Sequence, residues 1–444
     1  RRPINLRKPI VLGVDLGTSA CKVCAGDEAG RLLGVESAPY PILTPHPGWS
    51  EQDARAWLPA MESALARLVD ALPDLRTEVR ALSFSSAAHI PVLLDENAEP
   101  IRNAILWSDQ RSGEESARLA EELGEEIFAQ TCNQASPTWT LPQLVWVKKH
   151  EPSAWRRVRR ICLSKDFGIY QLTGRFGTDP ATAVSALLYD VRVGRWSAQL
   201  LGRLGIGPEM LPRVLPVTGT VGPLLPAVAD RIGLPRGIPV VAGTLDSVAE
   251  TYCTGATRPG DCVIRLGTGG GVQLLRPGPV GHPRLISYPY PLDPLWLSQA
   301  GTNACGASID WASRIIAEAG GSPEAVSRLA GGAPPGAGGV IYHPYLLGER
   351  CPHWDGALRA SFVGLGIERG QGELLAFLFE QLLLGGVEFG RLQHADADQM
   401  LFDHVADLGH QRGDVLAALL PVATTRVEHR LQLLDQEGDV TPLA

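Results

Sequence analysis

Features that would place the chain in a membrane-bound class are missing from its sequence. The most apolar later stretch, LLAFLFEQLLLGG, is interrupted by Glu380 and Gln381, and it falls short of the roughly 18 residues that a membrane-spanning helix requires. The basic start RRPINLRKPI lacks a long apolar region and a small-residue cleavage site, so no signal peptide is predicted. We expect a protein that no transmembrane helix anchors and that has no membrane partner.

Long basic runs and dense cysteine clusters are also missing. The 40 basic and 48 acidic residues give a net charge of −8, and no Lys/Arg run could follow a phosphate backbone, so we expect no nucleic acid as a partner. The 8 cysteines are spread over 444 residues, unlike a secreted disulfide framework. A reducing cytoplasm is the expected location. Cys21 and Cys24 have redox-like spacing but lie in a predicted strand, which favours packing.

The common nucleotide-binding loops do not occur either. No glycine-rich turn ends in Gly-Lys-Ser/Thr, and no GxGxxG opens a helix after the first strand. Instead Gly17, Thr18 and Ser19 form a turn between two apolar strands. Glycine lets backbone amides approach an anion, the two hydroxyls add donors, and Asp15 could hold a hydrated divalent cation. An ordinary tight turn is the alternative for a single copy of this pattern.

A second copy of the turn favours the phosphate interpretation. VDLGTSACKV and IRLGTGGGVQ share Leu-Gly-Thr at the same offset, and each lies between two apolar strands. The second turn contains Gly267, Thr268, Gly269 and Gly270. Two anion-binding turns in two halves could hold a polyphosphate between them, so we predict a duplicated architecture.

The remaining pattern predicts an α/β protein. An amphipathic helix over residues 56–72 leads to a strand at 79–86, and further helices are expected at 113–130, 141–149 and 197–204. The Pro/Gly-rich residues 205–226 are interpreted as a connector between packed units. Near residue 240 the pattern restarts with a buried strand, a helix and a strand pair, which predicts a domain boundary there.

Two further side chains are candidates for chemistry. Asp246 follows Gly243 at the end of a buried strand, where it could reach into a cleft or begin the next helix as its N-cap. His89 lies in a short connection between two strands and could bond a ligand, although a lone histidine is more often structural. The spacing of His343, Glu349 and His353 matches no zinc site closely.

Several sequence blocks, taken in order, resemble the FGGY family of carbohydrate kinases over about residues 9 to 390. Within the family, ILWSDQR and GERCPHWD are most similar to xylulokinases, whereas SFSSAAH is similar to the loop of gluconokinases. The blocks are GVDLGTSACKV, HPGWSEQDARAW, SFSSAAHIPVLLDENAEPIRNAILWSDQR, LSKDFGIYQLTGRFGTDPATA, AGTLDSVAE, IRLGTGGG and YHPYLLGERCPHWDGALRASFVGLG.

The resemblance implies a duplicated actin-like, ribonuclease H-like α/β fold of two domains that bind a small sugar, ATP and Mg²⁺. It implies Asp246 as the general base and Asp15 as a metal ligand. The residues implied for the sugar are Ala88, His89, Trp107, Asp109, Arg111 and Ser247. Those implied for the nucleotide phosphates are Gly17, Thr18, Ser19, Lys22, Gly267, Thr268, Gly269 and Gly270. Ala88 and Gly269 depart from the family pattern, which usually has a larger residue and a serine there.

Residues 391–444 depart most from the family. They contain only three isolated glycines, no tryptophan, four of the 10 histidines and one aromatic residue, Phe402. The glycine-rich adenosine motif is missing, and we interpret this tail as a foreign end, as from a changed reading frame. The predicted domains are therefore residues 9–240, 241–390 and an atypical 391–444.

The predicted function is ATP-dependent phosphorylation of a small sugar, most similar to that of xylulokinases. A gluconate or polyol kinase and an impaired sugar-binding remnant remain alternatives. An acetate-kinase-like or chaperone ATPase is disfavoured because its blocks are absent. The sequence leaves open which sugar hydroxyl reacts and whether the chain is a homodimer.

Overall fold

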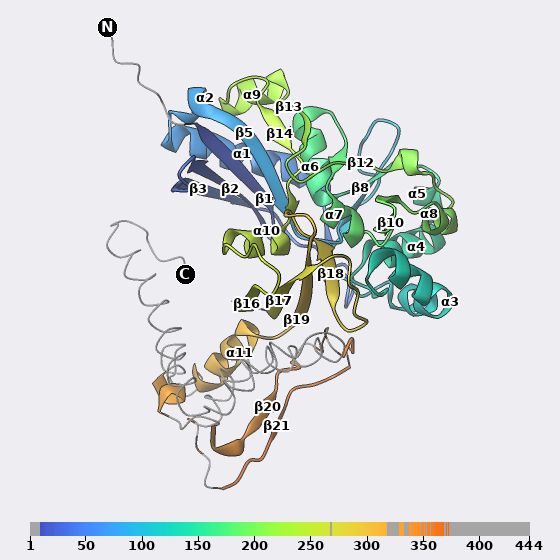
Figure 1. The fold of residues 1–444 in the computed structure, drawn as a ribbon, viewed down its shortest axis with the longest axis vertical. Coiled ribbons are helices and arrows are strands. Elements are labelled where there is room, and N and C mark those ends of the chain that lie inside the picture. Colours follow the sequence, from blue (N-terminus) through green and yellow to red (C-terminus); the bar gives the residue numbers. More distant parts are fainter. Residues whose placement is uncertain are drawn as a thin grey trace. The chain divides into compact units, whose positions relative to one another are not determined.

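The computed structural model describes residues 9–266, 269–317, 328–332, 337–346 and 357–367, with residues 348, 349, 351, 353–355, 370 and 372. The chain forms two compact units (Figure 1). The first contains residues 9–263 and 273–299, and the second contains residues 264–266, 269–272 and the described residues from 300 onward. The domain limits predicted from the sequence stay a prediction, and residues 391–444 lie outside the described residues.

A mixed sheet organises the first unit. Strands β1 to β3 form an antiparallel meander, and β5 pairs with β1 in parallel. Strands β14 and β15 both pair with β5 in parallel, while β13 closes the sheet as an antiparallel edge. The strands are β1 (Ile10–Leu16), β2 (Ala20–Asp27), β3 (Leu32–Pro39), β5 (Val79–Ser86), β13 (Thr220–Pro223), β14 (Pro239–Val241) and β15 (Thr244–Leu245).

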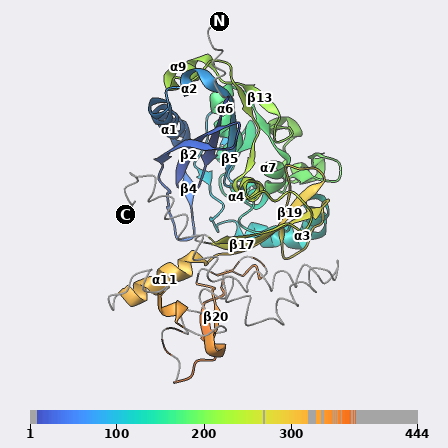
Figure 2. The ribbon, with the colours of Figure 1, turned by 60° about the vertical axis from the view of Figure 1, so that its left-hand side comes forward.

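Helices α1 (Trp57–Ala71), α6 (Ser164–Thr173) and α9 (Pro226–Ile232) pack with the buried side of this sheet in one hydrophobic core (Figure 2). Alternate residues of β1 are buried, as expected for a strand with one covered face. Gly168 lets α6 pack directly against β1 and β5, since a Cβ there would lie 2.7 Å from Leu16 Cδ1 and 3.1 Å from Phe84 Cε1.

The other elements of the first unit surround this core. Four of its short strands form two antiparallel pairs, β4 with β7 and β6 with β8. The elements are β4 (Glu51–Gln52), α2 (Leu75–Glu78), β6 (Pro91–Leu94), β7 (Ala104–Ile105), α3 (Gly113–Thr131), α4 (Thr140–His150), α5 (Pro152–Trp155), β8 (Arg160–Leu163), β9 (Gly177–Thr178), α7 (Pro180–Ser185), β10 (Tyr189–Asp190), β11 (Arg195–Trp196), α8 (Ala198–Leu204), β12 (Arg213–Val214) and α10 (Asp246–Cys253), with 3₁₀ turns at Ala54–Ala56 and Pro208–Met210.

A second sheet follows in the chain, with the order β16-β17-β19-β18. Its strands β18 and β19 are antiparallel. The remaining elements are β16 (Cys262–Leu266), β17 (Gly270–Pro277), β18 (Ile286–Pro289), β19 (Leu295–Thr302), α11 (Gly306–Ala317), a 3₁₀ turn at Ala337–Gly339, β20 (Ile341–His343) and β21 (Ser361–Val363).

The structure confirms the predicted helices at α1, α3, α4 and α8 and the strand at β5. The interpretation of residues 205–226 as a connector is wrong, because β13 pairs with β14 and forms an edge of the main sheet. Pro223 is compatible with this strand because an edge position needs fewer ladder hydrogen bonds. All 8 cysteines are free thiols, and Cys21 and Cys24 both lie in β2.

Candidate active site

Three parallel strands of the main sheet end at one edge. Asp15 of β1 pairs with Ser85 of β5, and Ser85 pairs in turn with Thr244 of β15. The carboxyl ends of these strands therefore lie side by side, which is where open α/β sheets place their ligands. The turn at 17–19, the connection at 87–89 and Asp246 continue the chain from these three ends. We take this edge as the candidate active site.

The turn at residues 17–19 is held by side chains from outside it. Tyr40 Oη donates to the Gly17 carbonyl over 2.6 Å, and Gln52 Nε2 donates to the Thr18 carbonyl over 2.5 Å. The Tyr40 amide donates to the Ser19 carbonyl over 3.1 Å. All three carbonyl oxygens thus accept hydrogen bonds from the protein. This arrangement fixes the turn that the sequence predicts for phosphate.

Gly17 leaves room beside the carboxylate of Asp15. A Cβ there would lie 3.2 Å from the Ala20 carbonyl and 3.4 Å from Asp15 Oδ2, so a side chain would crowd the space beside this carboxylate. Its amide donates to the Ala20 carbonyl over 3.1 Å, which leaves Thr18 and Ser19 as the predicted phosphate donors. Ser19 and Lys22 are exposed, and Lys22 pairs directly with Asp15 across the β1–β2 ladder.

Asp15 is half-buried and oriented by a neighbouring strand. Ser85 Oγ donates to Asp15 Oδ1 over 2.8 Å, and this contact fixes the carboxylate at the end of β1. A half-buried carboxylate that one hydroxyl orients is an oxygen donor of the kind that holds hydrated Mg²⁺. The residues present therefore fit the cation that the sequence predicts.

Asp246 is the first residue of α10 and is half-buried. Its Oδ1 accepts from the Ser247 amide over 2.6 Å. The alternative reading as an N-cap is off by one residue, because Leu245 occupies that position. A carboxylate in the first turn is favoured by the helix dipole. Ser247, predicted to bind the sugar, is 7 % exposed.

His89 is buried, with a left-handed backbone at φ 63°. Its Nδ1 lies 2.9 Å from the Ser185 carbonyl, which requires Nδ1 to carry the proton. Its Nε2 then accepts from Tyr288 Oη over 3.0 Å. Trp139 contacts the ring edge-on with a centroid distance of 4.2 Å. His89 thus joins the half-buried Ala88 connection to α7 and β18, and its contact with a sugar stays a prediction.

We expect His89→Ala to raise the KM for the sugar roughly 5- to 150-fold, because the connection at 87–89 then loses its buried hydrogen bonds to Ser185 and Tyr288, and such a loss costs about 1–3 kcal/mol. The KM for the nucleotide should change little. Steady-state kinetics with each substrate varied separately measure both constants. His150→Ala is the matched control, since it removes a histidine that bonds Glu115 of α3. An equal rise of both KM values would place His89 outside the sugar side.

Asp109 and Arg111 form a buried ion pair rather than an exposed surface. Each side chain is 1 % exposed, and Arg111 Nη2 lies 2.7 Å from Asp109 Oδ2. The guanidinium also bonds Glu51 Oε1 over 2.7 Å and stacks on Trp49 at 3.6 Å. Trp107 is half-buried, and its Nε1 donates to Thr18 Oγ1 over 3.1 Å. In this structure the ion pair supports the segment that carries Trp107, and direct sugar contact by these residues stays a prediction.

Glu51 makes this cluster sensitive to pH. Burial alone would raise its pKa, but the Arg111 hydrogen bond and the Arg102 charge outweigh burial and lower the pKa of Glu51 below its usual value. A carboxyl whose pKa is lowered on folding stabilises the fold above its unfolded pKa, and this stabilisation is lost as the pH falls through the folded pKa.

Glu51→Gln is therefore expected to lower the free energy of unfolding by roughly 3 kcal/mol at pH 7. The difference from the wild type should shrink as the pH falls below the ordinary glutamate pKa of about 4.3 and through the lowered pKa of folded Glu51, because the wild-type carboxyl then becomes protonated. Urea unfolding across this pH range measures the difference. A difference that stays constant with pH would contradict the assigned role of the Glu51 charge.

The second predicted turn lies partly outside the described residues, which exclude Gly267 and Thr268. Gly269 and Gly270 pack closely on the end of β19 and on the segment after it. A Cβ at Gly269 would lie 2.8 Å from the Thr302 carbonyl, and one at Gly270 would lie 2.9 Å from Cys305 Cβ. Close packing therefore explains both glycines, and their contact with phosphate stays a prediction.

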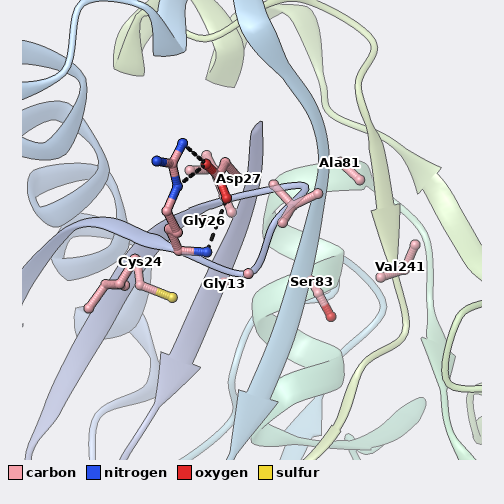
Figure 3. A pocket seen from close by; sticks show the side chains of 12 residues that line it. Gly13, Cys24, Gly26, Asp27, Ala81, Ser83 and Val241 are labelled. Carbon is pink, nitrogen blue, oxygen red and sulfur yellow. Dashed lines mark hydrogen bonds and ion pairs between the residues drawn. The ribbon is translucent and has the colours of Figure 1, made fainter. Parts of the chain in front are cut away.

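A hollow of about 490 Å³ lies on the main sheet away from the candidate edge (Figure 3). It is lined by the first half of β1 and by parts of β2 and β5, and its only charged lining residues, Asp27 and Arg31, form an ion pair of 2.6 Å. Largely apolar walls with this closed ion pair offer few groups that could orient a sugar or a phosphate. We therefore do not place the site there.

Within the described ranges, no helix could cross a membrane and no cluster of His, Cys, Asp and Glu could hold a metal by itself. Glu349 is 4 % exposed, and its carboxylate accepts from Thr302 Oγ1 over 2.6 Å and from the Asn303 amide over 3.1 Å. It thus closes a local network in the second unit.

Sequence reasoning missed the residues that orient the site. Ser85, Tyr40 and Gln52 bond Asp15 or the turn, and Tyr288 bonds His89 across 199 residues of chain. The pairing of β1 with β5 gives Ser85 its place opposite Asp15, and only this register could have pointed to it. No sequence signal marks Tyr288, because its contact depends on how β18 packs.

Comparison with known proteins identifies the family of the chain. Residues 10–253 match the N-terminal domain of the FGGY family of carbohydrate kinases, and residues 262–386 match its C-terminal domain. A xylulose kinase from Lactococcus lactis is 32% identical over 380 residues, which cover 85% of this chain and 75% of that protein. A gluconokinase from Bacillus subtilis is 28% identical over 366 residues, covering 80% and 71%.

Among solved structures, a protein described as a xyloylose kinase from Brucella ovis superposes with a TM-score of 0.82 at 30% identity, covering 88% of this chain and 80% of that one. This match confirms the predicted two-domain α/β sugar kinase fold. The two family domains match most of the sequence, and the Lactococcus lactis relative and the solved structure are similar to this chain over most of its length. The chain therefore belongs to the FGGY family of carbohydrate kinases and is a phosphotransferase that acts on a sugar.

Proposed function

We propose that the chain transfers the γ-phosphoryl group of ATP to a hydroxyl of a ketopentose such as D-xylulose. The observation that carries the proposal is the meeting of Asp15, the turn at 17–19 and Asp246 at one edge of the sheet. The relatives named as xylulose kinases support the choice of sugar, since they are 30–32% identical over 80% or more of the chain.

In the proposed reaction Asp246 accepts the proton of the sugar hydroxyl. The sugar oxygen forms a bond to the γ-phosphorus while the bond from that phosphorus to the bridging oxygen breaks, and ADP leaves. Such a transfer passes through a loose transition state, so positioning and charge stabilisation supply most of the acceleration. Asp15 would hold Mg²⁺, which would supply positive charge to neutralise the phosphates. Thr18 and Ser19 would orient the phosphates through their amides and hydroxyls.

A gluconate kinase is the second candidate. The gluconokinase from Bacillus subtilis at 28% identity and the gluconokinase-like loop SFSSAAH favour it. Ala88 leaves more space than the larger residue expected there, and that space could accept a different sugar end. Pocket shape, rather than motif, discriminates such substrates.

A substrate panel separates these candidates. Purified chain is incubated with MgATP and, in turn, with D-xylulose, other ketopentoses, polyols and gluconate, and ADP formation is followed. We expect D-xylulose to give the highest kcat/KM. Turnover of gluconate alone would replace the first candidate by the second. Sugar binding without ADP formation from any compound would instead support an impaired sugar-binding protein.

The composition of residues 391–444 predicts weak recognition of the adenine base. An adenine requires a flat apolar slot and a backbone that approaches the ring closely, which glycine permits. Residues 391–444 lack the glycine-rich motif, so we expect ATP and GTP to bind with Kd values within about threefold of each other. Isothermal titration with each nucleotide and Mg²⁺ measures this ratio. Micromolar affinity with a strong preference for ATP would contradict the prediction.

A further inference from the structure

A lysine is fully buried behind the strand that leads to Asp246. Lys165 of α6 is 0% exposed, and its Nζ donates to the Ala242 carbonyl over 2.7 Å. The same Nζ lies 3.2 Å from Asp179 Oδ1 and 3.5 Å from Asp166 Oδ1. One cation is thus enclosed by two carboxylates and one carbonyl of the segment that ends at the candidate base.

Asp179 connects this cation to the next turn of the same segment. Its Oδ2 accepts from Thr244 Oγ1 over 2.9 Å and from the Ala181 amide over 3.1 Å, which caps α7. Thr244 is 5% exposed. Lys165 and Asp179 therefore hold the segment at residues 242 and 244, four and two residues before Asp246.

Pairing with neighbouring strands supports residues 242–245 only weakly. β15 consists of two residues, Thr244–Leu245, and Gly243 before it interrupts the strand with φ 63°. Just before β15, the amides of Ala242 and Gly243 donate to the Gly219 and Val217 carbonyls over 2.9 and 3.0 Å. The carbonyl of Ala242 and the side chain of Thr244 are held by the buried charges instead.

Stability alone explains such a cluster poorly. Removing two charges from water costs several kcal/mol per ion, and well-packed apolar side chains often stabilise a core as well or better. Hydrogen bonds are directional, and apolar packing is not. Hydrogen bonds to residues 242–245 therefore fix the position of the next residue, Asp246.

We propose that Lys165, Asp179 and Thr244 are positioning residues that set the place of Asp246 for proton transfer. The proposal rests on the proposed function, because it assigns the cluster to the same base. None of the three is assigned contact with the sugar. Each acts through the backbone of residues 242–245.

A double-mutant cycle tests the proposal. Thr244→Val, which keeps the size and removes the bond to Asp179, should lower kcat about tenfold with the KM for the sugar unchanged within about threefold. In an Asp246→Asn background the same change should alter the residual kcat less than about twofold, because the base it positions is already lost. Lys165→Met should lower kcat about 100-fold if the variant folds, and Thr244→Val decides the matter if it does not.

Thr173→Val is the matched control, since it removes an equally buried hydroxyl of α6 that bonds the Ile169 carbonyl over 2.8 Å and does not touch the segment. It should leave kcat unchanged. Equal losses for Thr244→Val and Thr173→Val, or an equal loss from Thr244→Val in both backgrounds, would overturn the positioning role. Wild-type turnover by Asp246→Asn alone would instead overturn the proposed function.

Discussion

Asp246→Asn is expected to lower kcat by about 10²- to 10⁴-fold, the usual contribution of a general base. Asparagine keeps the shape of the side chain and loses the basic oxygen. Sugar affinity should therefore stay within about tenfold. A coupled ADP assay gives kcat, and equilibrium binding of the sugar gives the affinity.

Asp74→Asn is the control for the loss of one charge. Asp74 is exposed and precedes α2, which leads into the opposite end of β5. This variant should keep the wild-type kcat. If Asp246→Asn also turned over at the wild-type rate, the base would have to be sought elsewhere on the sheet edge.

Gly243→Ala is expected to destabilise the fold by more than about 4 kcal/mol, a size of effect that single substitutions rarely reach. A Cβ at this position would lie 1.8 Å from the Phe84 carbonyl oxygen and 2.7 Å from the Phe84 carbonyl carbon. The backbone of β5 cannot move far enough to relieve this clash without breaking its pairing with β1 and β15. Urea unfolding, or the loss of soluble protein, measures the effect.

Gly237→Ala separates the clash from the backbone conformation. Gly237 has φ 73°, close to the φ 63° of Gly243, but no atom lies within 4 Å of its added Cβ. Only the cost of a left-handed alanine remains, about 1–2 kcal/mol. Equal destabilisation by both variants would mean that the close approach to Phe84 does not require glycine.

Local pattern predicted much of the main sheet and its first helix. The hairpin of β1 and β2, α1 and β5 follow from alternation and from three-to-four spacing, both of which a single sequence shows. Helix α6 was missed because eight of its residues are buried, so no polar face marks its period. Strand β13 was missed because its glycine and proline are typical of loops.

The candidate site also combines residues that local patterns predict with partners that they do not predict. Asp15 lies near the end of a strand, Thr18 and Asp246 follow strands, and short-range signals predict such positions. The partners that fix them come from distant segments: Ser85 is 70 residues from Asp15, and Lys165 is 77 residues from Ala242. His89 shows the limit of the approach, since the bonds of its ring to Ser185 and Tyr288 depend on tertiary packing that no local pattern encodes.

The most direct test is a crystal structure of the chain with D-xylulose, Mg²⁺ and a non-hydrolysable ATP analogue. The proposed function predicts a sugar hydroxyl about 2.6–3.2 Å from an Asp246 carboxylate oxygen. It also predicts the cation beside Asp15, bound directly or through water. A sugar ordered away from the ends of β1, β5 and β15, for instance in the hollow beside Cys24, would contradict the assignment of this edge as the active site.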